Sequence, residues 1–172
     1  MLKRAGAVLI LLSATGLGLS YSLDLKKRCM ELRLLKQLIY LLRGELKYTR
    51  TPLPEAFSHM AERMREPFSS FLRSLEREMG KLGGKPFGEL WREQIDCGLA
   101  GTSLQKEDKE QLKALGEVLG YLDLEMQLGS LELYLEQLEV SILEAREAIR
   151  TRQKLYQSLG VAGGIFLILL LL

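Results

Sequence analysis

Histidine and cysteine are nearly absent from this chain of 172 residues, which contains one histidine and two cysteines. With His59 alone, the sequence supports no histidine-based catalytic triad, and no cluster of residues has the ligand spacing of a zinc site. Carboxylates such as Glu132 and Glu136 lie one helical turn apart on a charged face, where such pairs are usually solvated. The composition therefore predicts a protein that is not an enzyme and has no cofactor or metal.

A phosphate-binding loop and strand patterns are missing as well. Gly80, Gly83 and Gly84 precede Lys85, but Pro86 follows the lysine where the GxxxxGK[ST] pattern requires a hydroxyl residue. We expect a turn there. Alternating runs of β-branched or aromatic residues are absent, and apolar residues recur at intervals of three and four, so the sequence predicts an all-α fold.

Charge is missing from both ends of the chain. Nineteen residues from Ala5 to Leu23 and eighteen from Leu155 to Leu172 carry none. As helices these runs would each extend about 27 to 29 Å, close to the roughly 30 Å hydrocarbon core of a bilayer. The sequence therefore predicts an N-terminal transmembrane anchor at 1–23, a helical-bundle domain at 24–154 and a C-terminal transmembrane span at 155–172.

The first apolar run has an alternative interpretation as a cleaved signal peptide, because Lys3 and Arg4 give it a basic start. No small-x-small cleavage site is well placed, and a basic cluster follows the run as a stop-transfer signal would, so we expect a retained anchor. Bases on the inner flanks of both runs outnumber those outside and place the middle domain in the cytoplasm. The flanking bases expected at the membrane face are Lys26, Lys27, Arg28, Arg33, Arg150, Arg152 and Lys154.

The middle domain has no net charge, since residues 24–154 carry 22 basic and 22 acidic residues. No general nucleic-acid partner is implied. The charges are unevenly placed, because Glu117 to Glu144 holds seven acidic residues and no basic one. We expect the basic end to contact anionic lipid, with on the order of 1 kcal/mol per base. The acidic far end would meet a partner, or would simply keep a long helix soluble.

Breaks between helices are marked by proline and glycine, and they divide the middle domain into about six pieces. Thr51-Pro52-Leu53-Pro54 ends the first helix and starts the second, with the Thr51 hydroxyl as the expected cap. Later helices open near Pro67 and Pro86, the latter with Trp91 on its apolar face. A fifth helix is predicted over 104–119 and ends at Gly120. In a reducing cytoplasm, Cys29 and Cys97 are expected to be packing residues without a disulfide.

The last helix has an unbroken heptad seam, which steps alternately by four and three residues. It needs a long helical partner. The first helix, which enters from the same membrane surface, is the favoured one, and a self-paired coiled coil is the rival. The predicted architecture is an elongated antiparallel bundle whose first and last helices continue into the spans. The seam residues are Leu124, Leu128, Leu131, Leu135, Leu138 and Ile142, followed by Ala145 and Ile149.

The two apolar runs contain small residues at helix-packing spacing. Gly160 and Gly164 form a GxxxG pair, and Ala14 and Gly18 form a similar pair in the first run. We expect close helix packing in the bilayer, with the other span, a second copy or a different protein.

Taken together, these features resemble the stage III sporulation protein AB family of endospore-forming bacteria over nearly the whole chain. One departure is Leu122, where a small capping residue is expected before Asp123. The resemblance rests on the basic-apolar start over residues 1–12, Thr51-Pro52-Leu53-Pro54-Glu55-Ala56, Trp91, Leu119-Gly120 followed by Asp123 and Gln127, and residues 155–161 leading into Gly163-Gly164.

The resemblance implies a membrane component of the channel between mother cell and forespore, with a cytosolic bundle similar to that of type II secretion platform proteins. It implies no catalysis. The implied partners are the other stage III sporulation A-operon proteins, among them a secretion-type ATPase. A different class of function also fits the sequence, namely a membrane-tethered regulatory or sensor adaptor whose bundle responds to a small ligand. Stabilisation by a metabolite or nucleotide would separate this alternative from a structural role.

Overall fold

The computed structural model of the chain describes residues 2–49, 51–81, 84–121 and 123–171, and the side chains of 23–49, 51–81, 84–120, 123–152 and 155. Within these residues the fold is entirely helical, as the sequence predicts. Its elements are α1 (Leu2–Gly44), a short π-helix η1 (Glu45–Thr49), α2 (Leu53–Arg63), α3 (Phe68–Met79), α4 (Phe87–Gly98), α5 (Lys106–Tyr121) and α6 (Leu124–Leu171).

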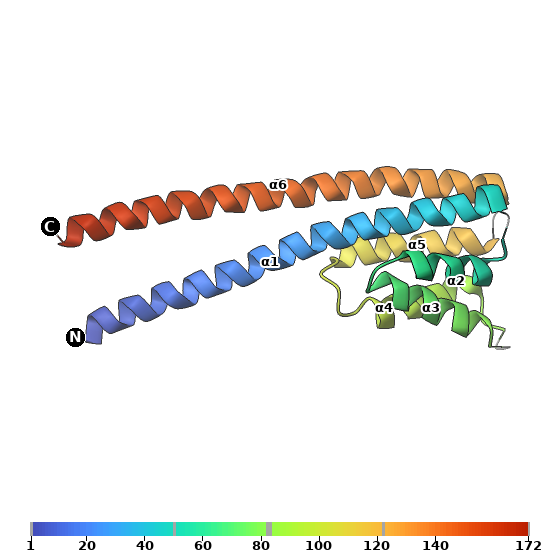
Figure 1. Cartoon of the computed structure of the whole chain (residues 1–172), viewed down its shortest axis with the longest axis horizontal. Coiled ribbons are helices and arrows are strands. Elements are labelled where there is room, and N and C mark those ends of the chain that lie inside the picture. The colour runs from blue at the N-terminus through green and yellow to red at the C-terminus, as the bar shows by residue number, and fades with distance from the viewer. Residues whose placement is uncertain (1, 50, 82–83, 122, 172) are drawn as a thin grey trace.

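Two long helices, α1 and α6, run antiparallel side by side, and both chain termini lie at the same end of this hairpin (Figure 1). The four short helices α2 to α5 pack against the other half of the hairpin on one side. The prediction that α1 is the long partner of the heptad seam is therefore confirmed. The register is set by two ion pairs, Lys36 with Glu139 and Arg43 with Glu132. A step of seven residues toward the C-terminal end of α1 therefore corresponds to a step of seven residues toward the N-terminal end of α6.

The seam of α6 is buried from Leu131 onward, with Leu135, Leu138 and Ile142 all 6% exposed or less. Leu128 is partly buried against the same core. The prediction for Leu124 is wrong, because this residue is 38% exposed. In the register of the hairpin, position 124 of α6 lies level with position 51, beyond the ends of α1 and η1, so no helix covers it.

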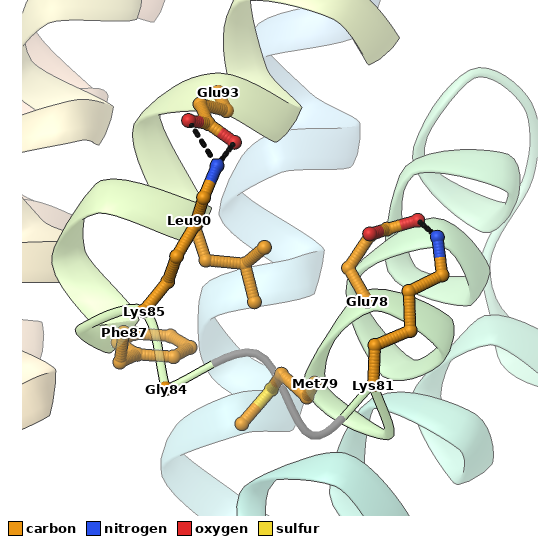
Figure 2. A pocket seen from close by; sticks show the side chains of 8 residues that line it. All are labelled: Glu78, Met79, Lys81, Gly84, Lys85, Phe87, Leu90 and Glu93. Carbon is orange, nitrogen blue, oxygen red and sulfur yellow. Dashed lines mark hydrogen bonds and ion pairs between the residues drawn. The ribbon is translucent and has the colours of Figure 1, made fainter.

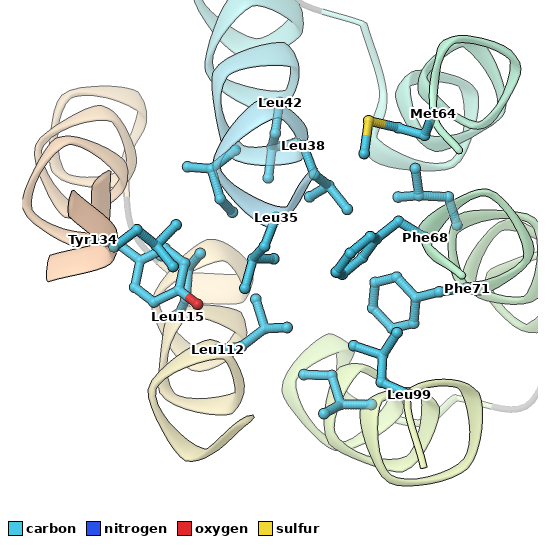
Figure 3. Close-up of a cluster of buried hydrophobic side chains, with 14 of the residues drawn as sticks. Leu35, Leu38, Leu42, Met64, Phe68, Phe71, Leu99, Leu112, Leu115 and Tyr134 are labelled. Atoms are coloured by element: carbon cyan, nitrogen blue, oxygen red, sulfur yellow. The ribbon is translucent and has the colours of Figure 1, made fainter. Parts of the chain in front are cut away.

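The core lies where the apolar face of α1 meets the short helices (Figure 3). Leu32, Leu35, Leu38, Ile39 and Leu42 of α1 are all 0% exposed. Each such side chain contributes roughly 1.5–3 kcal/mol when fully buried. Opposite them lie large side chains of the short helices, among them Phe57, Phe68, Phe71 and Trp91.

The sequence leads us to expect a side-chain cap at the start of α2 and of α6, and only α6 has one. Thr51 does not cap α2, because Pro52 occupies the N-cap position without a side-chain hydrogen bond and the Thr51 hydroxyl lies 3.5 Å from Glu45 Oε2. Asp123 does cap α6, since its Oδ1 accepts a hydrogen bond of 2.9 Å from the Met126 amide. Asp123 itself therefore provides the cap that is expected from the residue before it. Leu122 lies outside the described residues.

Helices α4 and α5 approach each other closely through glycines. Gly116 of α5 lies against the Trp91 ring, and Gly88 of α4 lies against the Glu117 backbone. Helix α5 ends at Tyr121, one residue past Gly120, so its end agrees with the prediction to within one residue. Gly120 lies inside α5, where a Cβ would meet Phe87 Cβ at 3.5 Å. The Trp91 indole also donates a hydrogen bond of 2.7 Å to the Leu112 carbonyl, which fixes the spacing of the two helices.

Candidate interaction surfaces

Exposed bases gather where α1 and α6 leave the globular part toward the termini. Lys26, Lys27, Arg33 and Arg150 are exposed, and Arg152 is half-buried. Extending the hairpin register ten residues from the Lys36–Glu139 pair brings Lys26 level with Ile149, so the two groups of bases meet at one height. The side chains of Lys154 and of the small-residue pairs Ala14 with Gly18 and Gly160 with Gly164 lie outside the described residues.

Arg28 does not belong to this exposed group, contrary to the prediction that it lies at the membrane face. Its side chain is buried, and it donates two hydrogen bonds to Asp108 of α5, from Nε at 2.8 Å and from an Nη at 2.9 Å. The hydrogen bond to Asp108 raises the pKa of the guanidinium, so Arg28 stays charged. Asp108 also accepts the Gln105 amide at 2.8 Å and thereby caps the start of α5.

Glu31, one turn beyond Lys27 on α1, makes a second buried contact with the same region. Its carboxylate accepts the Ser103 amide at 2.7 Å and lies 3.9 Å from Lys27 Nζ. Burial raises the pKa of Glu31 above its ordinary value. Arg28 and Glu31 together hold the connection between α4 and α5 against α1, at the end of the short helices that faces the termini (Figure 1).

The acidic stretch from Glu117 to Glu144 is partly paired in the structure. Glu132 and Glu139 pair with Arg43 and Lys36 of α1, and Glu117 pairs with Arg92. Glu125, Glu136 and Glu144 are exposed, and none of them forms an ion pair with the described residues. The described side chains therefore neutralise the acidic surface of α6 only in part.

A pocket between the end of α3 and the start of α4 is lined by apolar side chains and by charged side chains that pair with one another. Figure 2 shows Lys85 extended toward Glu93 at its mouth, with N–O distances of 2.7 and 2.9 Å. The hydrogen bond to Glu93 raises the pKa of Lys85, which keeps the amine protonated and non-nucleophilic. Glu78 and Lys81, three residues apart at the end of α3, pair with each other on the opposite side of the pocket.

The other residues considered for chemistry are scattered. Within the described ranges, no group of three or more His, Cys, Asp or Glu residues could hold a metal ion. His59 is exposed, 4.0 Å from Glu55. Cys29 is buried in the core, as expected of a packing residue, whereas Cys97 is exposed, contrary to that expectation.

Within the part of the chain that the structure describes, no helix has the length and apolarity needed to cross a bilayer. The side chains of the two apolar runs lie almost entirely outside that part. The membrane spans predicted from sequence therefore stay predictions.

The arrangement defines a class of protein, an all-α bundle in which a long antiparallel hairpin carries four short helices. The sequence profile described as "Stage III sporulation protein AB" matches residues 3–172. The chain belongs to the stage III sporulation protein AB family. It is 31% identical to the stage III sporulation protein AB of Bacillus subtilis (strain 168) over 172 residues, which is 100% of both chains.

A solved structure of stage III sporulation protein AB is also similar, with a TM-score of 0.67 and 28% identity. The match covers 72% of this chain and 97% of that one. The family ties the chain to sporulation and is not a known enzyme family.

Proposed function

We propose that this protein is a non-enzymatic, membrane-anchored assembly component of a secretion-like channel between mother cell and forespore. Its partners in this proposal are other stage III sporulation A-operon proteins, with the secretion-type ATPase on the mother-cell side. The single observation that carries the proposal is the meeting of exposed bases from α1 and α6 at the end of the hairpin that leads to both termini.

The basic end suits an anionic lipid surface. Lys26, Lys27 and Arg150 come from helices that are distant in sequence, yet they lie at one height of the hairpin, near the ends of the two uncharged runs. Arg33 lies two helical turns further along α1, level with Ile142. Each base near an anionic leaflet contributes about 1 kcal/mol. The opposite end of the bundle would then stand away from the membrane, where a partner reaches it.

Topology reporters test the orientation. A reporter inserted at the exposed Gly101 should report the cytoplasm, and one fused to the C-terminus should report the outside. An external reading at position 101 would overturn the proposal, because it would remove the bundle from any cytoplasmic partner. As a matched check, the combined substitution of Lys26, Lys27, Arg33 and Arg150 by Gln should weaken the orientation preference. Substitution of the exposed bases Lys47, Arg77, Lys81 and Lys85, at the end of the bundle far from the apolar runs, should leave it unchanged.

Lipid contact is tested with an environment-sensitive fluorophore on a single cysteine at position 150 of the full chain in nanodiscs, with the native Cys29 and Cys97 replaced by Ala. Emission should shift to the blue when anionic lipid replaces zwitterionic lipid, and the shift should weaken at high salt. The same label at position 77 of α3, also an exposed arginine site, serves as the control. Equal behaviour of the two positions would contradict the basic membrane face.

A further inference from the structure

The exposed surface of α6 carries large apolar side chains that no other described element covers. Met126, Leu133, Val140 and Leu143 are between 54% and 58% exposed. Leu133 lies two residues from both Leu131 and Leu135 of the seam, which at 100° per residue places it about 160° from each. We call these four residues the outer stripe. It extends about 26 Å along the helix.

Acidic side chains line the outer stripe along most of its length, and bases border it only at its Leu143 end, where Arg146 lies beside Arg33 and Lys36 of α1. Glu136 lies within the outer stripe, and Glu125, Glu132, Glu139 and Glu144 lie beside it, all exposed. No basic residue occurs in the sequence between Glu117 and Glu144. Arg43 and Lys36 of α1 reach Glu132 and Glu139 only from the hairpin side.

Apolar surface continues from the stripe into a shallow groove between α5 and α6. Leu133 borders this groove together with Ala114, Leu115 and Val118 of α5. Tyr134 also lines it, and its buried hydroxyl has no hydrogen-bond partner among the described residues. The stripe and groove together offer apolar contact wider than one row of side chains.

The charges decide between possible occupants. A second copy of this chain would place acid against acid in either a parallel or an antiparallel arrangement, which is destabilising. An anionic lipid surface would be repelled for the same reason. A helix with an apolar stripe flanked by Lys or Arg satisfies both features, since its apolar side chains cover the outer stripe and its bases meet the unpaired carboxylates.

We propose that the outer stripe of α6 docks a basic amphipathic helix of another protein. This inference rests on the proposed function, because it specifies the chemistry of the partner that the bundle receives. The geometry is that of helix-in-groove recognition, in which anchors at i, i+3 or i+4, and i+7 enter an apolar surface.

Site-specific photo-crosslinking of the full chain in sporulating cells of its native host tests the proposal. A photoreactive residue at position 133 or 140 should crosslink to a peptide of another protein that carries apolar residues at helical spacing with Lys or Arg on both sides. The same residue at position 70 of α3, an exposed serine, should not crosslink to that peptide. Crosslinking at 133 and 140 to a second copy, to lipid, to a non-basic segment or to nothing would overturn the inference.

Charge and apolar contact are then separated by variants. E136K should lower the crosslink yield from position 140 about tenfold or more, because it replaces an attractive charge contact with a repulsive one. L133S should lower the same yield about tenfold or more, because it removes an apolar contact. A tenfold change corresponds to about 1.4 kcal/mol. E62K makes the same charge change on exposed α2 and should have no effect. Because Leu133 and Glu136 are exposed, their variants should keep the thermal midpoint of the parent protein. Unchanged yields in both variants would overturn the inference.

The two proposals fail in different ways. If removal of the gene blocks sporulation and topology reporters place the bundle in the cytoplasm, but L133S and E136K sporulate and crosslink normally, only the docking inference is wrong. If the bundle lies outside the cytoplasm, the proposed function itself is wrong.

Discussion

Gly116 of α5 lies directly against the indole ring of Trp91 in α4. A Cβ at position 116 would lie 2.1 Å from Trp91 Cδ1, far inside van der Waals contact. The ring cannot move aside easily, because its Nε1 donates to the Leu112 carbonyl at 2.7 Å and it packs against Phe57, Phe71 and Phe87. Trp91 was singled out from sequence as a family feature, whereas its partner Gly116 was not.

Gly116→Ala should therefore destabilise the protein by about 1–3 kcal/mol or more, as overpacked cores do. Thermal unfolding followed by the fluorescence of Trp91, the only tryptophan, measures this. Gly129→Ala is the matched control, because a Cβ there meets nothing within 4 Å. That variant should stabilise by about 0.5–1 kcal/mol through helix propensity. Equal effects of the two substitutions would contradict the close packing.

Arg28→Ala should cost about 3–5 kcal/mol of unfolding free energy, because it leaves Asp108 buried without its cation. Lys26→Ala, two residues away and exposed, should cost well below 1 kcal/mol. Denaturant unfolding of the full chain in detergent compares the two. If Arg28 faced lipid, as the basic cluster alone suggests, both variants would unfold at the same denaturant concentration.

Tyr134→Phe should raise stability, by roughly 1 kcal/mol, because the Tyr134 hydroxyl is buried without a hydrogen-bond partner in the described structure. Burial also raises the pKa of this phenol, so the group stays neutral over the accessible pH range. Tyr40→Phe changes an exposed hydroxyl and serves as the control with little expected effect. A lower thermal midpoint for Tyr134→Phe would show that the hydroxyl has a stabilising partner after all.

Glu31 should make stability fall as pH rises. Because burial raises its pKa in the folded state, the folded protein binds a proton more readily than the unfolded chain. Above the folded-state pKa of Glu31, the ionised carboxylate lowers the free energy of unfolding. This loss of stability diminishes as pH falls through the folded-state pKa toward the ordinary pKa. Glu31→Gln, which can still accept the Ser103 amide, should raise the thermal midpoint at about pH 8.

The gain from Glu31→Gln should shrink as pH falls to about 4, where the native carboxyl also becomes neutral. Thermal midpoints across this pH range, with exposed Glu62→Gln as the reference, provide the measurement. A gain that is constant with pH would assign the effect to packing and not to charge.

Much of the fold could be predicted from the sequence because its signals are local. Pro67 and Pro86 mark helix starts that the structure reproduces, since proline fits a first helical turn and disfavours helix before it. The heptad seam predicts a long partner helix for α6. Helix α1 is that partner, and its apolar face also follows from residues spaced three and four apart. Gly120 lies one residue before the end of α5, where the sequence predicts it, but the sequence does not show that Phe87 of α4 packs against this glycine.

The sequence by itself determined the helical class, the main helix boundaries and the concentration of bases and acids in separate segments, because each depends on residues within one or two helical turns. Only the tertiary structure decided that Arg28 leaves the basic cluster for Asp108, 80 residues away, and that Leu124 lies beyond the reach of α1. It alone also showed that no other helix of the described chain covers the apolar residues at 126, 133, 140 and 143. Long-range pairings of this kind depend on which helix lies opposite, and periodicity along one helix does not contain that information.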